Sequence, residues 1–330
     1  MHEGIATADS KANIAFVKYW GVRDAELNIP YNDSLSMNLS DAVTVTTVHF
    51  GDYPADTLVI DRHGAAPAQV RRASRHLDHI RRLAGTQSRA RIESRNSFPM
   101  GTGMASSAAG FAALTLAASA ALGMQLSERE LSALARLGSG SACRSIPSGY
   151  TWWHAGHDHA SSFAETIAPP EHWDLRDVTA VVSAAHKEVS SAQGHRLADT
   201  SPFLSARLAD LPRRLARVQV ALLARDIEVL GEELEAEAIA LHVLAMTSRP
   251  PLLYWEPATV QIMQLCPRWR AEGVGVYFTL DAGPNVHLMC EAAHAGEVVE
   301  RLKALPNVQA TYVNGPAGPA HLIAEHLFTP

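Results

Sequence analysis

The stretch that decides the fold spans residues 94–110 and reads SRNSFPMGTGMASSAAG. Gly101 and Gly103 allow the backbone to turn tightly, and Ser106 and Ser107 open an alanine-rich segment that predicts a helix. Backbone N–H groups, hydroxyls and the positive end of a helix dipole therefore meet at one point, which favours a bound phosphate. The same residues also fit a plain glycine-rich turn with a serine N-cap. The loop alone leaves both interpretations open.

This loop matches neither of the two common nucleotide-binding motifs. A Walker A loop needs Lys followed by Ser or Thr after its glycines, and no such pair is present. The dinucleotide fingerprint needs a third glycine where Ser106 stands. A different phosphate-binding architecture is therefore expected.

Hydrophobic periodicity and turn residues on both sides of the loop predict an α+β chain. The expected strands cover residues 43–50, 57–60, 91–94, 148–153, 178–184, 274–280, 286–290 and 308–313. The expected helices cover residues 69–83, 106–122, 127–137, 202–237, 257–272 and 295–304, with a capping box of Ser127 and Glu130, Gly123 after the second helix and a break at Leu211–Pro212. A domain boundary is predicted near residue 185, which gives domains 1–185 and 186–330.

Composition excludes several classes of protein. The 330 residues carry 28 basic and 34 acidic side chains, a net charge of −6, so a nucleic-acid partner is not expected. The longest apolar stretch, residues 108–122, is too short to span a membrane. No signal peptide is visible, and Cys143, Cys266 and Cys290 are widely spaced. We expect a cytoplasmic protein that acts on a small molecule without a membrane.

Several blocks of the sequence resemble one family. PMGTGMASSAAGFAAL is similar to the phosphate loop of the GHMP kinase superfamily, and the whole chain resembles the mevalonate diphosphate decarboxylases. The matching blocks are ANIAFVKYWG (12–21), NDSLSMNL (32–39), the loop, GSGSACRSI (138–146), FTLDAGPN (278–285) and, more weakly, KEVSSAQG…DTSPF (187–203). The resemblance implies a ribosomal-S5-like N-terminal domain, a ferredoxin-like C-terminal domain and a homodimer.

The resemblance also implies a reaction and the residues that carry it. The family uses ATP and Mg²⁺ to phosphorylate the C3 hydroxyl of a 5-phosphorylated mevalonate, after which phosphate and CO₂ leave. Asp281 matches the family's catalytic aspartate, and Lys18 would order the region of Asp281 and the C3 oxygen. Arg144 would hold the C1 carboxylate of the substrate. Taken alone, Asp281 also fits an ordinary Asx turn in a hairpin.

The remaining site residues follow from the same blocks. Residues implied for substrate binding, besides Arg144, are Tyr19, Ser139, Ser141, Lys187 and Arg196. Residues implied for ATP binding are Ser94, Asn96, Pro99, Gly101, Gly103, Ser106 and Ser107, with Ser106 also a candidate ligand of Mg²⁺.

The chain departs from the family where the terminal phosphate of the substrate would bind. The family usually follows KYWG with a lysine, whereas here Val22 follows. Leu197-Ala198-Asp199 stands where the family commonly has Leu-Thr and then a variable residue, an arginine in some members. One charge-assisted hydrogen bond contributes about 1.5–3 kcal/mol, so its loss lowers affinity about tenfold or more. The departures predict mevalonate 5-phosphate as substrate, with isopentenyl phosphate as product. The alternatives are a diphosphomevalonate decarboxylase, a GHMP kinase that does not decarboxylate, and a non-catalytic descendant of the fold.

Two other groups of residues invite a functional interpretation that we do not adopt. His154, His157, Asp158 and His159 resemble a metal cluster, but their position between two predicted strands favours a solvated hairpin tip. Cys143 has no paired histidine motif to activate it, so packing is expected.

Overall fold

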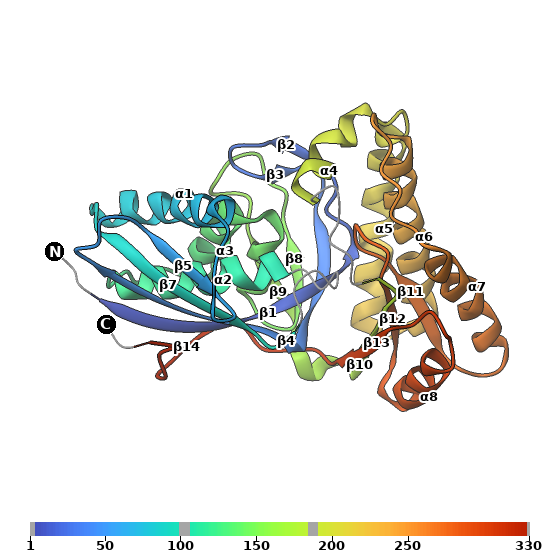
Figure 1. The fold of residues 1–330 in the computed structure, drawn as a ribbon. Helices are drawn as coiled ribbons and strands as arrows, with labels where there is room; N and C mark the ends of the chain where they lie inside the picture. Colours follow the sequence, from blue (N-terminus) through green and yellow to red (C-terminus); the bar gives the residue numbers. More distant parts are fainter. Residues whose placement is uncertain (1–3, 99–105, 184–190, 329–330) are drawn as a thin grey trace.

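The computed structural model describes residues 4–98, 106–183 and 191–328. These residues form two large sheets, each covered by helices, and a short ribbon that pairs β2 (Val22–Asp24) with β3 (Ile29–Pro30) (Figure 1). Strands and helices are both abundant, as expected for an α+β protein. Within the described ranges no helix has the length and apolar character needed to cross a membrane.

The first sheet is built around two long strands that pair antiparallel, β1 and β4. Its strands lie in the order β14 (His321–Ile323), β1 (Ile5–Val17), β4 (Ser34–Gly51), β7 (Arg89–Asn96), β5 (Thr57–Ile60) and β6 (His63–Gly64). The first residues of β4 also pair with β8 (Tyr150–Trp153), which pairs with β9 (Ala164–Ala168). All pairs are antiparallel except β5 with β7.

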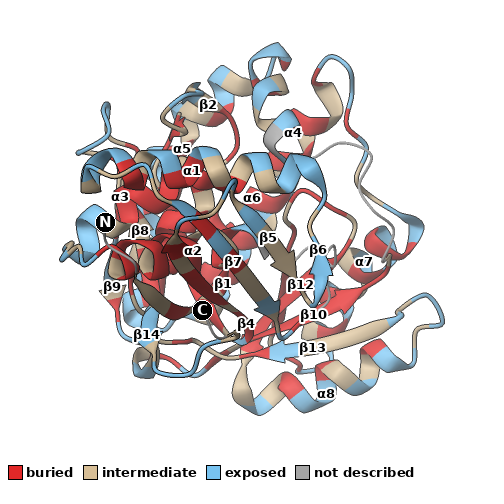
Figure 2. Ribbon diagram, turned by 60° about the vertical axis from the view of Figure 1, so that its left-hand side comes forward, coloured by how far each residue is buried: buried red, intermediate tan, exposed pale blue. Residues whose placement is uncertain are grey.

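Three helices pack on the first sheet: α1 (Pro67–Ala84), α2 (Ser106–Ala121) and α3 (Glu128–Gly138). Helix α2 lies between the sheet on one side and α3 on the other, so both of its faces are buried (Figure 2). Small side chains such as Ala112 and Ala117 permit this close packing, which explains why the helix is rich in alanine.

The second sheet is fully antiparallel and has helices on both faces. Its strands lie in the order β11 (Val276–Thr279), β12 (Val286–Glu291), β10 (Leu175–Val181) and β13 (Ala310–Asn314). Alternate residues such as Val286 and Leu288 pack against α7 (Pro257–Ala271) and α8 (Ala292–Lys303). The opposite face, which includes Met289, packs against α5 (Leu204–Ala224) and α6 (Ile227–Thr247).

The two halves share one hydrophobic core. Ile14 and Phe16 of β1 pack in the same cluster as Leu215 of α5 and Leu234 of α6. Helices α5 and α6 therefore fill the space between the two sheets (Figure 1). Strand β10 precedes residue 185 yet belongs to the second sheet, and β14 returns to the first. The division of the chain at residue 185 stays a prediction.

The helix expected at residues 202–237 is wrong in two respects: it does not break at Leu211–Pro212, and its second part, α6, does not end at 237 but continues to Thr247. Pro212 lies inside α5, and the chain turns instead at Arg225, which has φ of 58° and caps α5. Asp226 then caps α6 by accepting a hydrogen bond from the Val229 N–H at 3.0 Å. A proline removes one donor from a helix, but burial of Leu211 and Leu215 on either side of it keeps α5 continuous.

The other expected elements are confirmed with shifts of a few residues at their ends, except that the strand expected at 43–50 begins much earlier, at Ser34. The capping box of Ser127 and Glu130 forms, and Gly123 ends the loop-proximal helix with φ of 68°. The strand expected at 178–184 begins earlier, at Leu175. Helix α4 (Ser191–Leu197) completes the set, together with 3₁₀ helices at Gly140–Ser145, Pro170–His172 and Ala198–Thr200.

Candidate active site

Lys18 and Asp281 form an ion pair between the two halves of the chain. Lys18 follows the last residue of β1, and Asp281 lies in the loop between β11 and β12. The Lys18 Nζ donates to Asp281 Oδ1 at 2.9 Å, and the side chains are 1% and 28% exposed. The carboxylate is therefore held by a buried cation while part of it stays accessible. Its bond to Lys18 is a long-range contact, unlike the local Asx turn that Asp-Ala-Gly alone would suggest.

The surroundings of Asp281 keep its carboxylate ionised. Burial raises the pKa of this carboxyl, but the charge and hydrogen bond of Lys18 oppose burial and prevail. His287 and Arg144 contribute positive charge in the same direction, so the pKa of Asp281 lies below its ordinary value. A carboxylate of this kind can orient a hydroxyl, accept its proton and stabilise a nearby positive charge.

Arg144 lies in the 3₁₀ helix that follows α3 and is 4% exposed. Its Nε donates to Asn13 Oδ1 at 3.0 Å, and its Nη1 donates to Ser34 Oγ at 2.8 Å. Strands β1 and β4 therefore fix the guanidinium, and its second terminal nitrogen has no partner among the described residues. An oriented, buried guanidinium is suited to bind a carboxylate or a phosphate.

The segment around Arg144 also places three other predicted substrate-binding residues. A side chain at Gly140 would lie 2.8 Å from the Tyr19 hydroxyl, so glycine permits this approach. Ser139 ends α3 and is 8% exposed, and the Ser141 carbonyl accepts from Asn13 Nδ2 at 3.2 Å. Tyr19, Ser139 and Ser141 are thus brought together with Arg144. Burial raises the pKa of Tyr19, and the charge of Arg144 opposes part of this rise.

The residues expected to bind ATP are only partly described. Ser106 is the first residue of α2, and the Ser107 hydroxyl lies 3.2 Å from the Ser139 hydroxyl. The beginning of α2 is therefore adjacent to the segment that carries Arg144. Pro99, Gly101, Gly103, the Ser106 side chain and Lys187 lie outside what the structure describes.

Ser94 and Asn96 lie on β7, the strand that leads into the loop. The Ser94 hydroxyl is 2.8 Å from the Thr46 hydroxyl. Asn96 accepts from Thr44 at 2.7 Å and donates from Nδ2 to Asp61 at 3.1 Å. Both side chains are thus anchored within the sheet, and their roles toward ATP stay predictions. Arg196 is exposed on α4 and makes no ion pair with any residue in the described ranges.

His195 is a residue of this site that sequence analysis missed. Its ring stacks on Tyr19 with centroids 3.9 Å apart, and its Nδ1 accepts from the Gly21 N–H at 3.1 Å. Enclosure between Tyr19 and Trp20, with a smaller effect of Arg144, lowers the pKa of His195 to about 3. The imidazole is therefore neutral and has Nε2–H as a donor. His195 lies within the block 187–203, but only its contacts with Tyr19 and Gly21 show that it belongs to the site.

The histidine-rich segment and Cys143, which we did not interpret as functional, have ordinary structural surroundings. His154 pairs with Glu165 at 2.8 Å, and no group of three or more His, Cys, Asp or Glu side chains in the described residues is arranged to hold a metal. Cys143 is buried, which raises the pKa of its thiol to about 12, so it is inert as a nucleophile. Trp20 is 1% exposed and packs in the core.

Fold and site together define an α+β enzyme for a small anionic substrate. A buried lysine paired with a partly exposed aspartate and a buried guanidinium lie near the junction of its two halves. A family model described as the diphosphomevalonate decarboxylase-like N-terminal domain matches residues 10–164. A second, described as the mevalonate 5-diphosphate decarboxylase C-terminal domain, matches residues 178–318. The chain belongs to the mevalonate diphosphate decarboxylase family, whose fold is of the GHMP kinase type.

Individual relatives and solved structures agree with this assignment. Diphosphomevalonate decarboxylase mvd1 of Aspergillus fumigatus is 35% identical and covers 94% of this chain and 83% of its own. Phosphomevalonate decarboxylase of Haloferax volcanii is 34% identical and covers 97% of this chain and 98% of its own. A solved structure of MDDEF in complex with MVAPP, AMPPCP and magnesium has a TM-score of 0.91 at 35% identity, covering 97% of this chain and 99% of that one. The chain is accordingly a carboxy-lyase that acts on a phosphorylated mevalonate.

Proposed function

We propose that this enzyme converts mevalonate 5-phosphate and ATP into isopentenyl phosphate, CO₂, ADP and phosphate. The observation that carries the proposal is the ion pair of buried Lys18 with the partly exposed carboxylate of Asp281, on which the charge of Arg144 also acts. Decarboxylation of this substrate has no carbonyl to accept electrons, so loss of a C3 phosphate must supply the driving force. Phosphoryl transfer and decarboxylation therefore belong to one reaction.

Asp281, Lys18 and Arg144 each have a role in this reaction. Asp281 accepts the C3 hydroxyl proton as the hydroxyl attacks the γ-phosphorus of ATP and ADP leaves. After this proton passes to solvent, the restored carboxylate stabilises positive charge at C3. Lys18 keeps Asp281 ionised and oriented. Arg144 binds the C1 carboxylate through the guanidinium nitrogen that Asn13 and Ser34 leave available. Ser139 and Ser141 supply hydroxyls beside it.

ATP is proposed to bind where α2 begins. Ser106 and Ser107 stand at the positive end of a 16-residue helix, and Ser107 lies next to Ser139, so a γ-phosphate there would be close to the substrate. This fits the ATP analogue in the MDDEF complex. Mg²⁺, when bound, neutralises charge on the transferred phosphoryl group, and Ser106 is its proposed protein ligand. Ser94, Asn96, Pro99, Gly101 and Gly103 complete the proposed nucleotide site, whereas Lys187 and Arg196 are proposed to bind the substrate.

The preference for a monophosphate rests on the residues around Gly21, where Tyr31, Ala198 and His195 make contact. Val22 brings no charge, and Asp199 brings a negative one, hydrogen-bonded to the Tyr31 hydroxyl. His195 is neutral and offers a single donor. A diphosphate carries more negative charge than a monophosphate and gains less from such a site. The Haloferax relative matches nearly the whole length of both chains. Its name, phosphomevalonate decarboxylase, supports this preference.

The second candidate substrate is mevalonate 5-diphosphate, which the name of the Aspergillus relative favours. Steady-state kinetics with purified enzyme, ATP, Mg²⁺ and each substrate separates the two. We expect kcat/KM for the monophosphate to exceed that for the diphosphate at least about tenfold. A higher kcat/KM for the diphosphate overturns the substrate assignment. Release of ADP without CO₂ would instead identify a kinase.

Restoring a basic side chain after Gly21 should shift the specificity. We expect Val22→Lys to raise kcat/KM for mevalonate 5-diphosphate about tenfold and to change that for the monophosphate by less than about threefold, because one charge-assisted hydrogen bond is gained. Val22→Gln is the matched control, since it adds length without charge. Equal gains for both substrates in both variants would show that Val22 does not determine the phosphate count.

We infer the assembly and the location of the enzyme from the family to which it belongs. We expect a cytoplasmic homodimer from the resemblance to the family. Sedimentation equilibrium of the full chain measures the assembly directly, and a single monomeric species across the micromolar range would contradict it.

A further inference from the structure

We propose that helix α6 positions both members of the catalytic pair, with Glu237 fixing Lys18 and His242 fixing Asp281. The two are positioning residues, since neither side chain is placed against substrate. The inference rests on the proposed roles of Lys18 and Asp281 and adds the device that brings them together from opposite halves of the chain.

The backbone of Lys18 is held by side chains rather than by a neighbouring strand. Pairing of β1 with β4 ends at Val17, so the N–H and C=O of Lys18 fall beyond the ladder. The Lys18 N–H donates to Glu237 Oε1 at 3.0 Å, and the Lys18 carbonyl accepts from Arg207 Nη2 at 2.9 Å. Asn32 Nδ2 also donates to that carbonyl at 3.1 Å.

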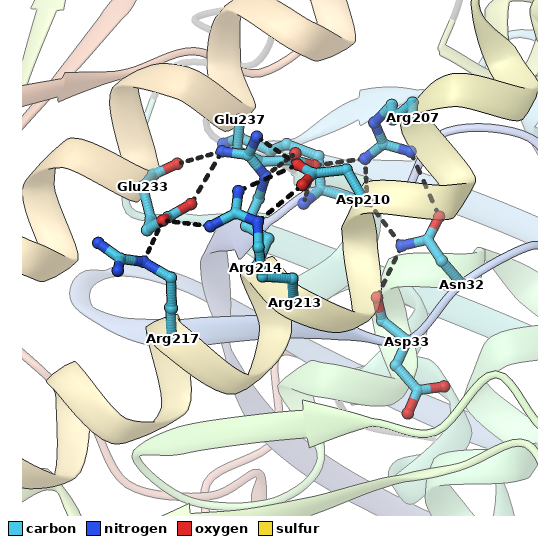
Figure 3. A network of polar contacts seen from close by, with 10 residues as sticks. Asn32, Asp33, Arg207, Asp210, Arg213, Arg214, Arg217, Glu233 and Glu237 are labelled. Carbon is cyan, nitrogen blue, oxygen red and sulfur yellow. Dashed lines mark hydrogen bonds and ion pairs between the residues drawn. The ribbon is translucent and has the colours of Figure 1, made fainter.

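Glu237 is the charged centre of this arrangement. It is 0% exposed, and its carboxylate receives a hydrogen bond from Arg207 and forms an ion pair with Arg214 at 3.3 Å (Figure 3). Asn32 and Arg207 lie side by side at one end of the network, as Figure 3 shows. A buried carboxylate between two arginines is costly to move, because separation leaves unpaired charges out of water. The Lys18 backbone is therefore clamped to a rigid group.

The same helix reaches Asp281 five residues further on. His242 is 0% exposed, and its Nε2 donates to the Asp281 carbonyl at 3.2 Å. The Asp281 carbonyl also accepts from the Gly283 N–H at 2.7 Å, which closes the turn. Glu237 and His242 thus tie the two ends of the Lys18–Asp281 ion pair to one helix. The distance between Nζ and Oδ1 is therefore set by this helix in addition to the shared core of the two halves.

The arrangement has a measurable consequence for acid sensitivity. Among the described residues, the titratable groups that face Asp281 are Lys18 just after β1, His287 on β12, Arg144 on its 3₁₀ helix and His242 on α6. Lys18 opposes the effect of burial on the Asp281 pKa most strongly. If Lys18 moves away, burial prevails and the pKa rises, so the carboxylate is protonated at a higher pH. The acid limb of kcat must then shift upward.

The test compares Glu237→Gln with Glu233→Gln in the full-length enzyme. Glu233 lies one turn earlier on α6, is 6% exposed and pairs with Arg213, Arg214 and Arg217, but it does not touch Lys18. The Gln oxygen can still accept from the Lys18 N–H, but the neutral amide leaves Arg207 and Arg214 without a paired charge and so loosens the group that holds Lys18. We expect Glu237→Gln to lower kcat about 10- to 100-fold with little change in KM, and to move the acid limb of kcat to higher pH. Glu233→Gln should lower the melting temperature by a comparable amount and leave kcat and its acid limb unchanged. Titration of the ATP phosphates is common to both variants and cancels in the comparison.

His242 gives a second test in case Glu237→Gln does not fold. We expect His242→Gln, which keeps a donor for the Asp281 carbonyl, to retain kcat within about threefold, and His242→Leu to lose about tenfold or more. Equal kcat in His242→Gln and His242→Leu, or an unmoved acid limb in Glu237→Gln, overturns the inference. The proposed function fails by a different result, which is normal turnover in Asp281→Asn.

Discussion

Replacing Asp281 with Asn is expected to lower kcat by about 10³-fold or more while ATP binding stays within about twofold of the wild-type value. The amide keeps the size of the carboxylate and can still accept from Lys18, so the geometry of the pair is retained. It cannot accept the C3 hydroxyl proton, and it offers no charge to a cationic centre. Turnover is measured by ADP and CO₂ release, and nucleotide affinity by calorimetry.

The control for this variant is Asp177→Asn. Asp177 is a buried carboxylate on β10 of the same sheet, and it pairs with His287 at 2.9 Å instead of Lys18. Both variants remove one charge from a partner, so both should lower the melting temperature. Only Asp281→Asn should abolish turnover. A large loss of ATP affinity in Asp281→Asn, with substantial residual kcat, would contradict the role assigned to the carboxylate.

Much of the fold follows from signals that are local in the sequence. The capping box of Ser127 and Glu130 and the hairpin around Asp281 are settled by residues a few positions apart, and both are confirmed. Pro212 shows the limit of local signals. It predicts a break in the helix, but the packing of Leu211 and Leu215 against the first sheet keeps α5 continuous, and the turn occurs at Arg225 instead.

The residues of the site also fall into those with a local sequence signal and those without one. Lys18, Asp281 and Arg144 are found from short blocks of sequence, and the structure brings them to one place. His195 and Glu237 could not be found from such blocks, because each matters through a contact with a residue far away in the sequence. His195 stacks on Tyr19, and Glu237 accepts from Lys18, which is 219 positions away. A buried glutamate in a helix has no local signature that separates a clamp from an ordinary ion pair.

Arg144→Lys is expected to raise KM for mevalonate 5-phosphate about 100-fold or more. Lysine retains the charge but has no planar fork, so it cannot bond Asn13, Ser34 and a carboxylate at once. Two charge-assisted hydrogen bonds of about 1.5–3 kcal/mol each are at stake, although part of this is recovered by the ammonium group. KM for ATP should change by less than about threefold, because α2 is not altered.

Arg136→Lys is the control that separates binding from folding. Arg136 is also a fully buried arginine near Tyr19, but its guanidinium bonds the carbonyls of Leu27, Ser162 and His159. Both variants should lose stability, and only Arg144→Lys should lose affinity for the substrate. A substrate analogue without the C1 carboxylate makes the comparison specific. If Arg144 binds that carboxylate, the analogue inhibits the wild type and Arg144→Lys with the same Ki. A Ki that rises in Arg144→Lys as much as KM does would mean that the guanidinium supports another part of the substrate, and the C1 carboxylate would then need a different cation.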